Sequence, residues 1–139
     1  MKIDAEPGTR ILLIRHGRTS WNEHGRLMGR ADIPLDEVGR AQARALLRLV
    51  RPFAPKAIWS SPLRRARATA LPLATEFDLT PHVDDRWSEV DVGELEGLTW
   101  SEIEERYPDF AGDLRMDPNH TRRPAGPADG FPHLIGHVL

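Results

Sequence analysis

A histidine between an arginine and a glycine, Arg15-His16-Gly17, directly follows the unbroken apolar run at residues 11–14. Open α/β sheets bind ligands at the carboxyl ends of their strands, and a histidine placed there can attack phosphorus and become a phosphohistidine. Arg15 would neutralise phosphate oxygens, and Gly17 would let the backbone approach the ligand closely. A histidine with a purely structural role is the alternative that this short motif leaves open.

A second cluster, residues 60–67, follows a short expected strand at 57–60 and opens a helix. The free backbone N–H groups of a helical first turn attract anions, and the guanidinium of Arg64 would add further donors. These features predict a second phosphate ligand at Arg64. The alternative is a solvated basic helix face, which is what we expect of Arg65 and Arg67.

Four carboxylic acids in residues 87–97 could supply a proton: Glu89, Asp91, Glu94 and Glu96. Cleavage of a phosphate ester needs a proton for the departing oxygen, and hydrolysis of a phosphohistidine needs a base for the attacking water. A partly buried carboxyl in an anionic pocket can hold a proton near neutral pH. We choose Glu89 for both steps and expect the other three acids to be ordinary surface charges.

Composition narrows the class of protein. The 139 residues are 40% hydrophobic, which suits a single folded domain over residues 1–139, and 19 basic and 21 acidic side chains leave a formal net charge of −2. A nucleic-acid partner is therefore not expected. The absence of cysteine excludes disulfides, zinc–thiolate sites and thiol catalysis, and it favours a cytoplasmic protein. No segment approaches transmembrane length, so no membrane association is expected.

Apolar patterning predicts the elements that position these side chains in the first half of the chain. Residues 10–15 read as a strand covered on both faces, and a long polar loop follows. A helix should begin at an Asp36 N-cap and end at Pro52. The strand at 57–60 should lead into a helix with Ser61 as N-cap and Pro62 as its first residue.

In the second half, Pro72 should kink or end that helix, and a weak strand is expected at 82–84. Thr99 and Glu102 have capping-box spacing for a short helix that Pro108 stops. Residues 118–132 should form a loop, and a helix should begin within 132–139. Alternating strands and helices predict an α/β fold with helices on both faces of a mostly parallel sheet.

Together these residues resemble the histidine phosphatase superfamily, the phosphoglycerate mutase-like group. The resemblance spans roughly residues 10–110, and its first block is Ile14-Arg15-His16-Gly17-Arg18-Thr19 with Trp21 and Asn22. It continues in order through Gly29, Asp32, Pro34-Leu35, Gly39, Gln42-Ala43, Ser60-Ser61-Pro62-Leu63-Arg64-Arg65-Ala66, Thr69-Ala70, Glu89, Gly93 and Glu96-Gly97.

The resemblance implies that His16 is the nucleophile, that Arg15 and Arg64 clamp the phosphate, that Asn22 is a polar pocket residue and that Glu89 is both acid and base. It implies a phosphomonoester hydrolase for small phosphorylated metabolites, with no metal or organic cofactor. The stretch from Leu98 to Pro108 resembles the phosphatase branches more than the glycolytic mutases, and phosphoglycerate mutase-type transfer is the alternative activity.

The sequence departs from the family pattern near its end. Members carry a second histidine, usually before a glycine at the end of a late strand, and no such segment occurs here. His133 and His137 do not fit that pattern. We therefore expect a chain that is truncated or incomplete at its C-terminal end, possible homo-oligomers, and, as a further alternative, a catalytically inactive phosphate-binding fragment.

Overall fold

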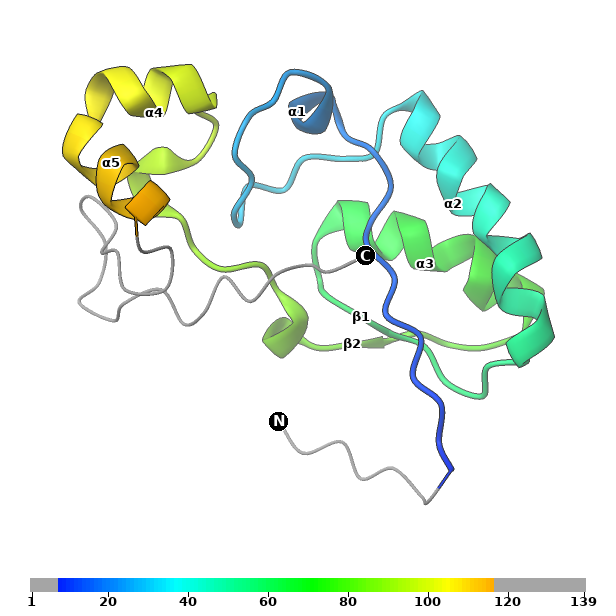
Figure 1. Cartoon of the computed structure of the whole chain (residues 1–139). Helices are drawn as coiled ribbons and strands as arrows, with labels where there is room; N and C mark the ends of the chain where they lie inside the picture. Colours follow the sequence, from blue (N-terminus) through cyan, green and yellow to red (C-terminus); the bar gives the residue numbers. More distant parts are fainter. Residues whose placement is uncertain (1–7, 117–139) are drawn as a thin grey trace.

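The computed structural model describes residues 8–116, so the expected loop at 118–132 and the helix within 132–139 lie outside the described residues. Figure 1 shows two helical groups, α2 with α3 and α4 with α5, joined by extended chain and a small sheet. The elements in chain order are α1 (Ser20–Glu23), α2 (Glu37–Val50), η1 (Arg51–Phe53), β1 (Trp59–Ser60), α3 (Arg64–Glu76), β2 (His82–Val83), η2 (Asp85–Trp87), η3 (Gly93–Leu95), α4 (Trp100–Arg106) and α5 (Pro108–Met116).

The sheet consists of β1 and β2, which pair in parallel with Trp59 opposite His82 and Ser60 opposite Val83. Trp59 and His82 also stack, with ring centroids 4.6 Å apart. The predicted α/β class is confirmed, and so are the expected strands near 57–60 and 82–84. Within residues 8–116, no helix has the length and apolar character that crossing a membrane requires.

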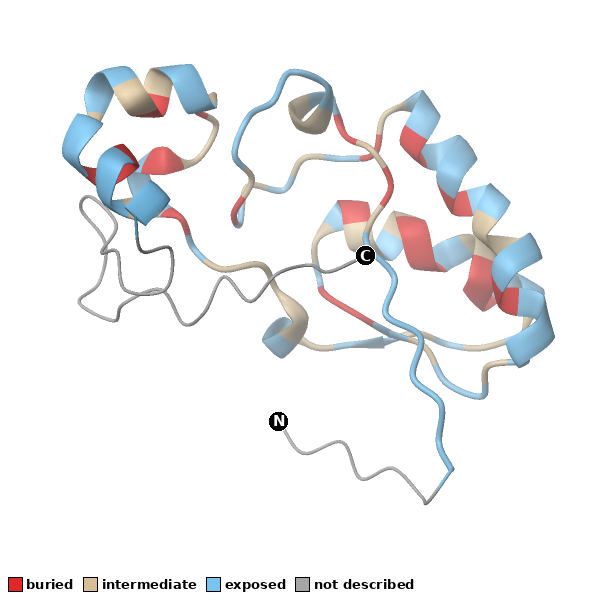
Figure 2. Cartoon of the chain, viewed as in Figure 1, coloured by how far each residue is buried: buried red, intermediate tan, exposed pale blue. Residues whose placement is uncertain are grey.

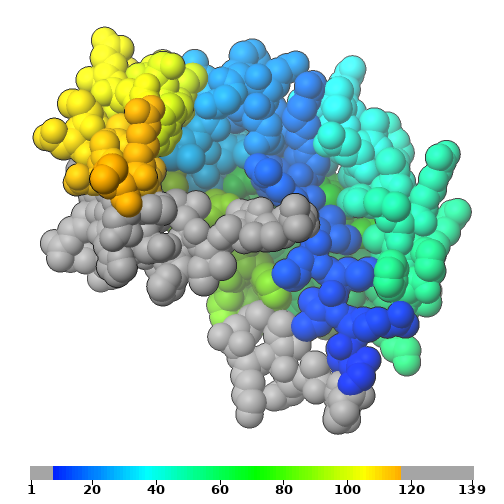
Figure 3. All heavy atoms as spheres, in the orientation of Figure 1, coloured from blue at the N-terminus to red at the C-terminus, as the bar shows by residue number. Residues whose placement is uncertain are grey.

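The prediction of a buried strand at residues 10–15 is wrong for this structure. No strand is assigned there, and the side chains of residues 11–14, the apolar segment, are exposed, Leu13 to 82%. Figure 2 shows this stretch in the exposed colour, and Figure 3 shows it on the face turned to the viewer. A strand forms only where a neighbour accepts and donates its backbone hydrogen bonds, and no other part of residues 8–116 pairs with this backbone.

Two helix starts follow the predicted capping. The Asp36 carboxylate accepts a hydrogen bond from the Gly39 N–H at 2.7 Å, which begins α2. At α4, the Thr99 hydroxyl accepts from the Glu102 N–H at 3.3 Å, and the Glu102 carboxylate accepts from the Thr99 N–H at 2.7 Å. Both caps lie within one helical turn of sequence, so spacing alone was enough to find them.

The predicted limits of α3 need correction. The helix begins at Arg64 with Leu63 as its N-cap, and the Ser61 hydroxyl instead accepts from the Leu63 N–H in a tight turn before it. Pro72 does not end the helix, which continues to Glu76. Proline removes one backbone hydrogen bond, but buried Leu73 and Ala74 hold the second half of the helix against its neighbours.

Two helices were not predicted. α1 is a single turn inside the expected loop, and α5 begins at Pro108, the residue expected only to stop α4. Proline suits the first position of a helix because its missing N–H has no partner there in any case. Pro108 therefore ends one helix and starts the next.

Buried apolar side chains gather in two places (Figure 2). α2 packs against α3, and each helix contributes small or medium side chains such as Ala43 and Leu73. The second group, here the α4–α5 core, consists of Val92, Leu95, Leu98, Ile103 and Phe110. The candidate site lies on the N-terminal loop beside α2.

Candidate functional site

His16 is held by its own backbone neighbour. Its Nδ1 lies 2.8 Å from the Gly17 carbonyl oxygen, which can only accept, so Nδ1 carries the proton. The second ring nitrogen, Nε2, is then unprotonated and has a free electron pair. The next residue is anchored to α3, because the Gly17 N–H donates to the Thr69 hydroxyl at 3.0 Å and that hydroxyl donates to the Arg65 carbonyl at 2.7 Å.

The surroundings of His16 keep its ring neutral. The side chain is half-buried, and burial is the main reason that its pKa lies below the ordinary value. Its hydrogen bond to the Gly17 carbonyl opposes this shift, the positive charges of Arg65 and Arg15 lower the pKa further, and the charge of Glu89 raises it. A neutral imidazole with a free Nε2 is the form that can act as a nucleophile.

The loop after His16 passes very close to the start of α2. A Cβ added at Gly17 would lie 2.5 Å from the Gly39 carbonyl oxygen, and one added at Gly39 would lie 2.0 Å from the Arg18 carbonyl oxygen. Neither contact is possible for a residue with a side chain. The glycine after His16 is therefore explained by packing of the loop on α2.

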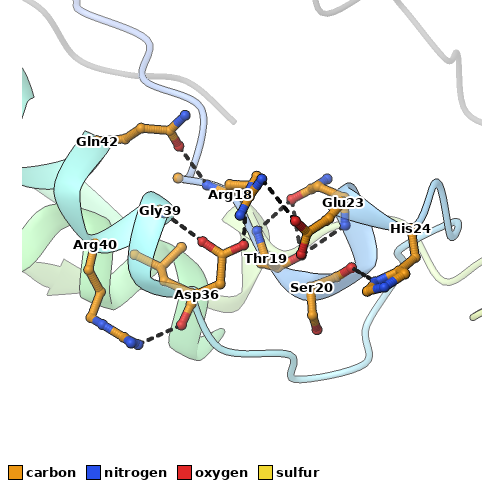
Figure 4. A network of polar contacts seen from close by, with 12 residues as sticks. Arg18, Thr19, Ser20, Glu23, His24, Asp36, Gly39, Arg40 and Gln42 are labelled. Carbon is orange, nitrogen blue, oxygen red and sulfur yellow. Dashed lines mark hydrogen bonds and ion pairs between the residues drawn. The ribbon is translucent and has the colours of Figure 1, made fainter.

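Arg18 joins this loop to α1 and α2 (Figure 4). Its Nε donates to the Asp36 carboxylate at 2.7 Å, and its Nη1 lies 3.3 Å from the Glu23 carboxylate. Its backbone N–H donates to the Gln42 side-chain oxygen at 2.8 Å. The Gly39 N–H and Arg18 both hold the pKa of Asp36 below its ordinary value, so Asp36 stays charged.

Asn22 is fixed by a capping box that the sequence did not reveal. Its side-chain oxygen accepts from the Thr19 N–H and from the Thr19 hydroxyl, both at 3.0 Å. The Thr19 hydroxyl in turn accepts from the Asn22 N–H at 3.3 Å. With the oxygen turned to α1, the NH2 group of Asn22 is the part left to meet a ligand.

These side chains line an open pocket with a volume of about 430 Å³. The lining residues are Arg15, His16, Arg18, Asn22 and Gln42. The structure thus brings three of the sequence-predicted residues, Arg15, His16 and Asn22, to one pocket. Arg18 and Gln42 were not predicted, although Arg18 follows Gly17 directly in the same motif.

The two adjacent arginines of α3 have opposite environments. Arg65 is 2% exposed, and its guanidinium donates to the carbonyls of Ala31 and Gly29, both at 2.7 Å. The expectation that Arg65 belongs to a solvated basic face is therefore wrong. Arg64 is not buried and does not line the pocket, and its backbone N–H donates to Asp32 at 2.7 Å. Of the two, it is Arg65 whose charge acts on His16.

Residues 89–96 provide both a candidate acid and a structural carboxylate. Glu89 is half-buried and interacts electrostatically with His16 and Arg65, and its carboxylate accepts from the Val90 N–H at 3.0 Å. Glu96 is not an ordinary surface charge, because it accepts from the N–H groups of Gly29 and Ala31 at 3.0 and 2.7 Å. Arg65 and Glu96 therefore hold opposite polar groups of one loop.

Sequence comparison identifies the family. Residues 11–130 match the histidine phosphatase superfamily (branch 1). The chain belongs to this superfamily. The metal-independent phosphoserine phosphatase of Arabidopsis thaliana is 37% identical to this histidine phosphatase family member over 145 aligned residues, which cover 100% of this chain and 58% of the plant protein.

Two mycobacterial comparisons agree with this assignment. The glucosyl-3-phosphoglycerate phosphatase of Mycobacterium tuberculosis is 38% identical over 99 residues, 71% of this chain and 44% of that protein. A solved mycobacterial glucosyl-3-phosphoglycerate phosphatase in complex with VO3 is 36% identical with a TM-score of 0.70, over 76% of this chain and 53% of that one. The chain thus spans about half the length of the relatives that it matches.

The part of this superfamily member that the structure describes shows no cluster of three or more His, Asp or Glu side chains that could hold a metal ion. His133 and His137 lie outside the described residues. The contacts of Arg15, Asn22, Gly17 and Arg64 with phosphate and the catalytic roles of His16 and Glu89 stay predictions. The N–H of Gly17 is already donated to Thr69.

Proposed function

We propose that this chain is the nucleophile-bearing part of a phosphomonoester hydrolase that acts on small phosphorylated metabolites. The observation that carries the proposal is the state of His16, whose Nδ1–H is committed to the Gly17 carbonyl and whose neutral form is favoured by burial. Its free Nε2 belongs to a side chain that lines a pocket with Arg15, Arg18 and two amide side chains. Membership of the histidine phosphatase superfamily and the phosphatase names of the relatives support it.

In the first chemical step, Nε2 of His16 attacks the phosphorus atom as the bond from phosphorus to the leaving oxygen breaks. Arg15 and the buried charge of Arg65 offset the negative charge of the phosphoryl oxygens. Glu89, within electrostatic reach of His16, gives its carboxyl proton to the leaving oxygen.

In the second step, a water molecule attacks the phosphohistidine. Glu89, now a carboxylate, takes a proton from that water as the bond between Nε2 and phosphorus breaks. Inorganic phosphate leaves, and both His16 and Glu89 return to their starting protonation states. The proposal names Arg65 beside Arg15 as a source of positive charge, because the charge of Arg65 acts on His16.

The test is covalent labelling of the purified chain with a radiolabelled aryl phosphate. We expect a protein-bound phosphate that is labile in acid and stable in base, together with steady release of the aryl alcohol. His16→Ala should abolish both. His24→Ala is the matched control, because His24 is exposed and hydrogen-bonds to Ser20 in α1. Equal labelling of His16→Ala and the parent protein would exclude the proposal.

A second candidate is phosphate binding without turnover. It is favoured by the exposed apolar segment just before His16 and by the chain's spanning about half the length of its relatives. Binding of phosphate or vanadate with no labelled protein and no hydrolysis would select this candidate. The cytoplasmic location and the absence of a nucleic-acid partner stay predictions.

A further inference from the structure

The pocket beside His16 offers hydrogen-bond donors almost exclusively. The side-chain oxygen of Gln42 is turned away from the opening, because it accepts from the Arg18 N–H at 2.8 Å. The side-chain oxygen of Asn22 is likewise committed, to Thr19. Each amide group can then present only its NH2 to a ligand, and no hydrogen bond from either NH2 occurs within residues 8–116.

The two arginines of the lining add to this donor set. Arg15 is only partly buried, and the described part of the chain shows no hydrogen bond or ion pair of its guanidinium. Arg18 is balanced by Asp36 and Glu23, so Arg15 supplies the uncompensated charge of the pocket. No carboxylate lines the pocket among the described residues. A ligand here meets positive charge and N–H donors but no charged acceptor.

A phosphoryl group at His16 would not use all of this. A volume of about 430 Å³ is that of a site for a small organic molecule, which leaves room for the group to which the phosphate is attached. Gln42 comes from α2, whereas His16, Arg15 and Asn22 come from the N-terminal loop and α1, so Gln42 forms a separate side of the pocket.

We propose that the NH2 group of Gln42 binds the leaving group of the substrate and that the site prefers phosphomonoesters whose leaving group carries a carboxylate. This inference rests on the proposed function, because it assumes that phosphate binds beside His16. A carboxylate accepts hydrogen bonds and donates none, so it matches both the donor-only lining and the charge of Arg15. An uncharged aliphatic leaving group would leave these donors without partners in the complex.

The test compares two non-hydrolysable ligands, 3-phosphonopropionate and propylphosphonate, which differ by a carboxylate in place of a methyl group. Calorimetric titration of the full chain should show 3-phosphonopropionate binding about tenfold more tightly, the factor expected for one hydrogen bond to a charged group. Propylphosphonate reports on the phosphate site alone. Equal affinities for the two ligands would overturn this inference and leave the proposed function standing.

Gln42→Glu assigns the preference to one side chain. Glutamate keeps an oxygen for the Arg18 N–H but replaces the NH2 group with a negative oxygen, so the tenfold preference should disappear or reverse. Gln42→Leu, which removes the donor without adding charge, should also reduce it. Arg48→Gln is the control, since it changes the net charge equally from a position on the same helix outside the pocket, and it should keep the preference.

Each remaining outcome is decisive. If both Gln42 variants keep the tenfold preference, another donor binds the carboxylate and the assignment to Gln42 is wrong. If the parent chain binds neither phosphonate nor inorganic phosphate, the proposed function fails, and this inference fails with it.

Discussion

Two apolar stretches of this protein end in opposite states. The α4–α5 core closes within one short stretch of chain, from Val92 to Phe110, and Ile103 at its centre is 1% exposed. The apolar segment at residues 11–14 is as hydrophobic in sequence, yet Leu13 is 82% exposed. The α4–α5 core finds its partners within a few helical turns, whereas a strand needs a partner that the chain must bring from elsewhere.

The difference teaches where hydrophobic patterning is informative. A helix satisfies its own backbone, so an apolar stripe needs only side-chain partners to become buried. A strand leaves every N–H and C=O group to a neighbour, and without one the same apolar residues stay in water. The four predictions below test this contrast, from the largest expected effect to the smallest.

Shortening a side chain in each stretch gives the largest effect. Ile103, 1% exposed, is part of the α4–α5 core, whereas Leu13 is in water in the folded state too. Ile103→Ala should lower the free energy of unfolding by about 3 kcal/mol, because it leaves a cavity. Leu13→Ala should change it by less than about 0.5 kcal/mol. Urea unfolding followed by circular dichroism measures both, and a similar cost for the two variants would mean that the apolar segment is buried in solution.

The adjacent arginines of α3 test the same contrast for polar side chains. Arg65 donates to the carbonyls of Ala31 and Gly29, and Arg64 is not buried. Arg65→Leu leaves both carbonyls without their donors, and we expect a loss of about 3 kcal/mol in unfolding free energy. Arg64→Leu should cost less than about 0.5 kcal/mol. Thermal unfolding of the two variants in parallel makes the comparison, and a larger loss for Arg64→Leu would contradict it.

Two helical glycines give opposite signs. An alanine Cβ at Gly39 would lie 2.0 Å from the Arg18 carbonyl oxygen, whereas one at Gly112 in α5 meets no atom within 4 Å. Gly39→Ala forces α2 away from the loop, which should cost about 2 kcal/mol. Gly112→Ala supplies the better helix former and should stabilise the protein by about 0.5–1 kcal/mol. Midpoints of urea unfolding decide the signs, and an unchanged midpoint for Gly39→Ala would show that the loop can move away freely.

The smallest effect concerns the titration of His16. Its pKa is lower in the folded protein than in the unfolded chain. The unfolded state therefore binds the proton more tightly, and stability falls as the pH drops below about 6.5 toward the folded pKa. His16→Gln should flatten the pH dependence of stability in that window. In the parent, Glu89→Gln should lower the pKa of His16 further and Arg15→Gln should raise it, as followed by NMR of the ring protons.

Much of the site could be predicted because the family motif is local. Arg15, His16 and Asn22 lie in one short stretch of sequence, and all three line the pocket. Gln42 could not be assigned, because its place depends on how α2 approaches the loop through Gly17 and Gly39. Arg64 was preferred to Arg65 because both can bind phosphate, and only the direction of each side chain on α3 separates them.

The sequence by itself determined the superfamily, the candidate nucleophile and the caps of α2 and α4, since each depends on residue types a few positions apart. The tertiary structure decided which arginine is buried, which way the amides of Asn22 and Gln42 face, and that the apolar segment stays exposed. The physical reason is the distance along the chain over which each contact forms. The Thr99 cap joins positions within a single helical turn, whereas the bond from Arg65 to Gly29 joins two separate parts of the chain, and spacing cannot reveal contacts of that length.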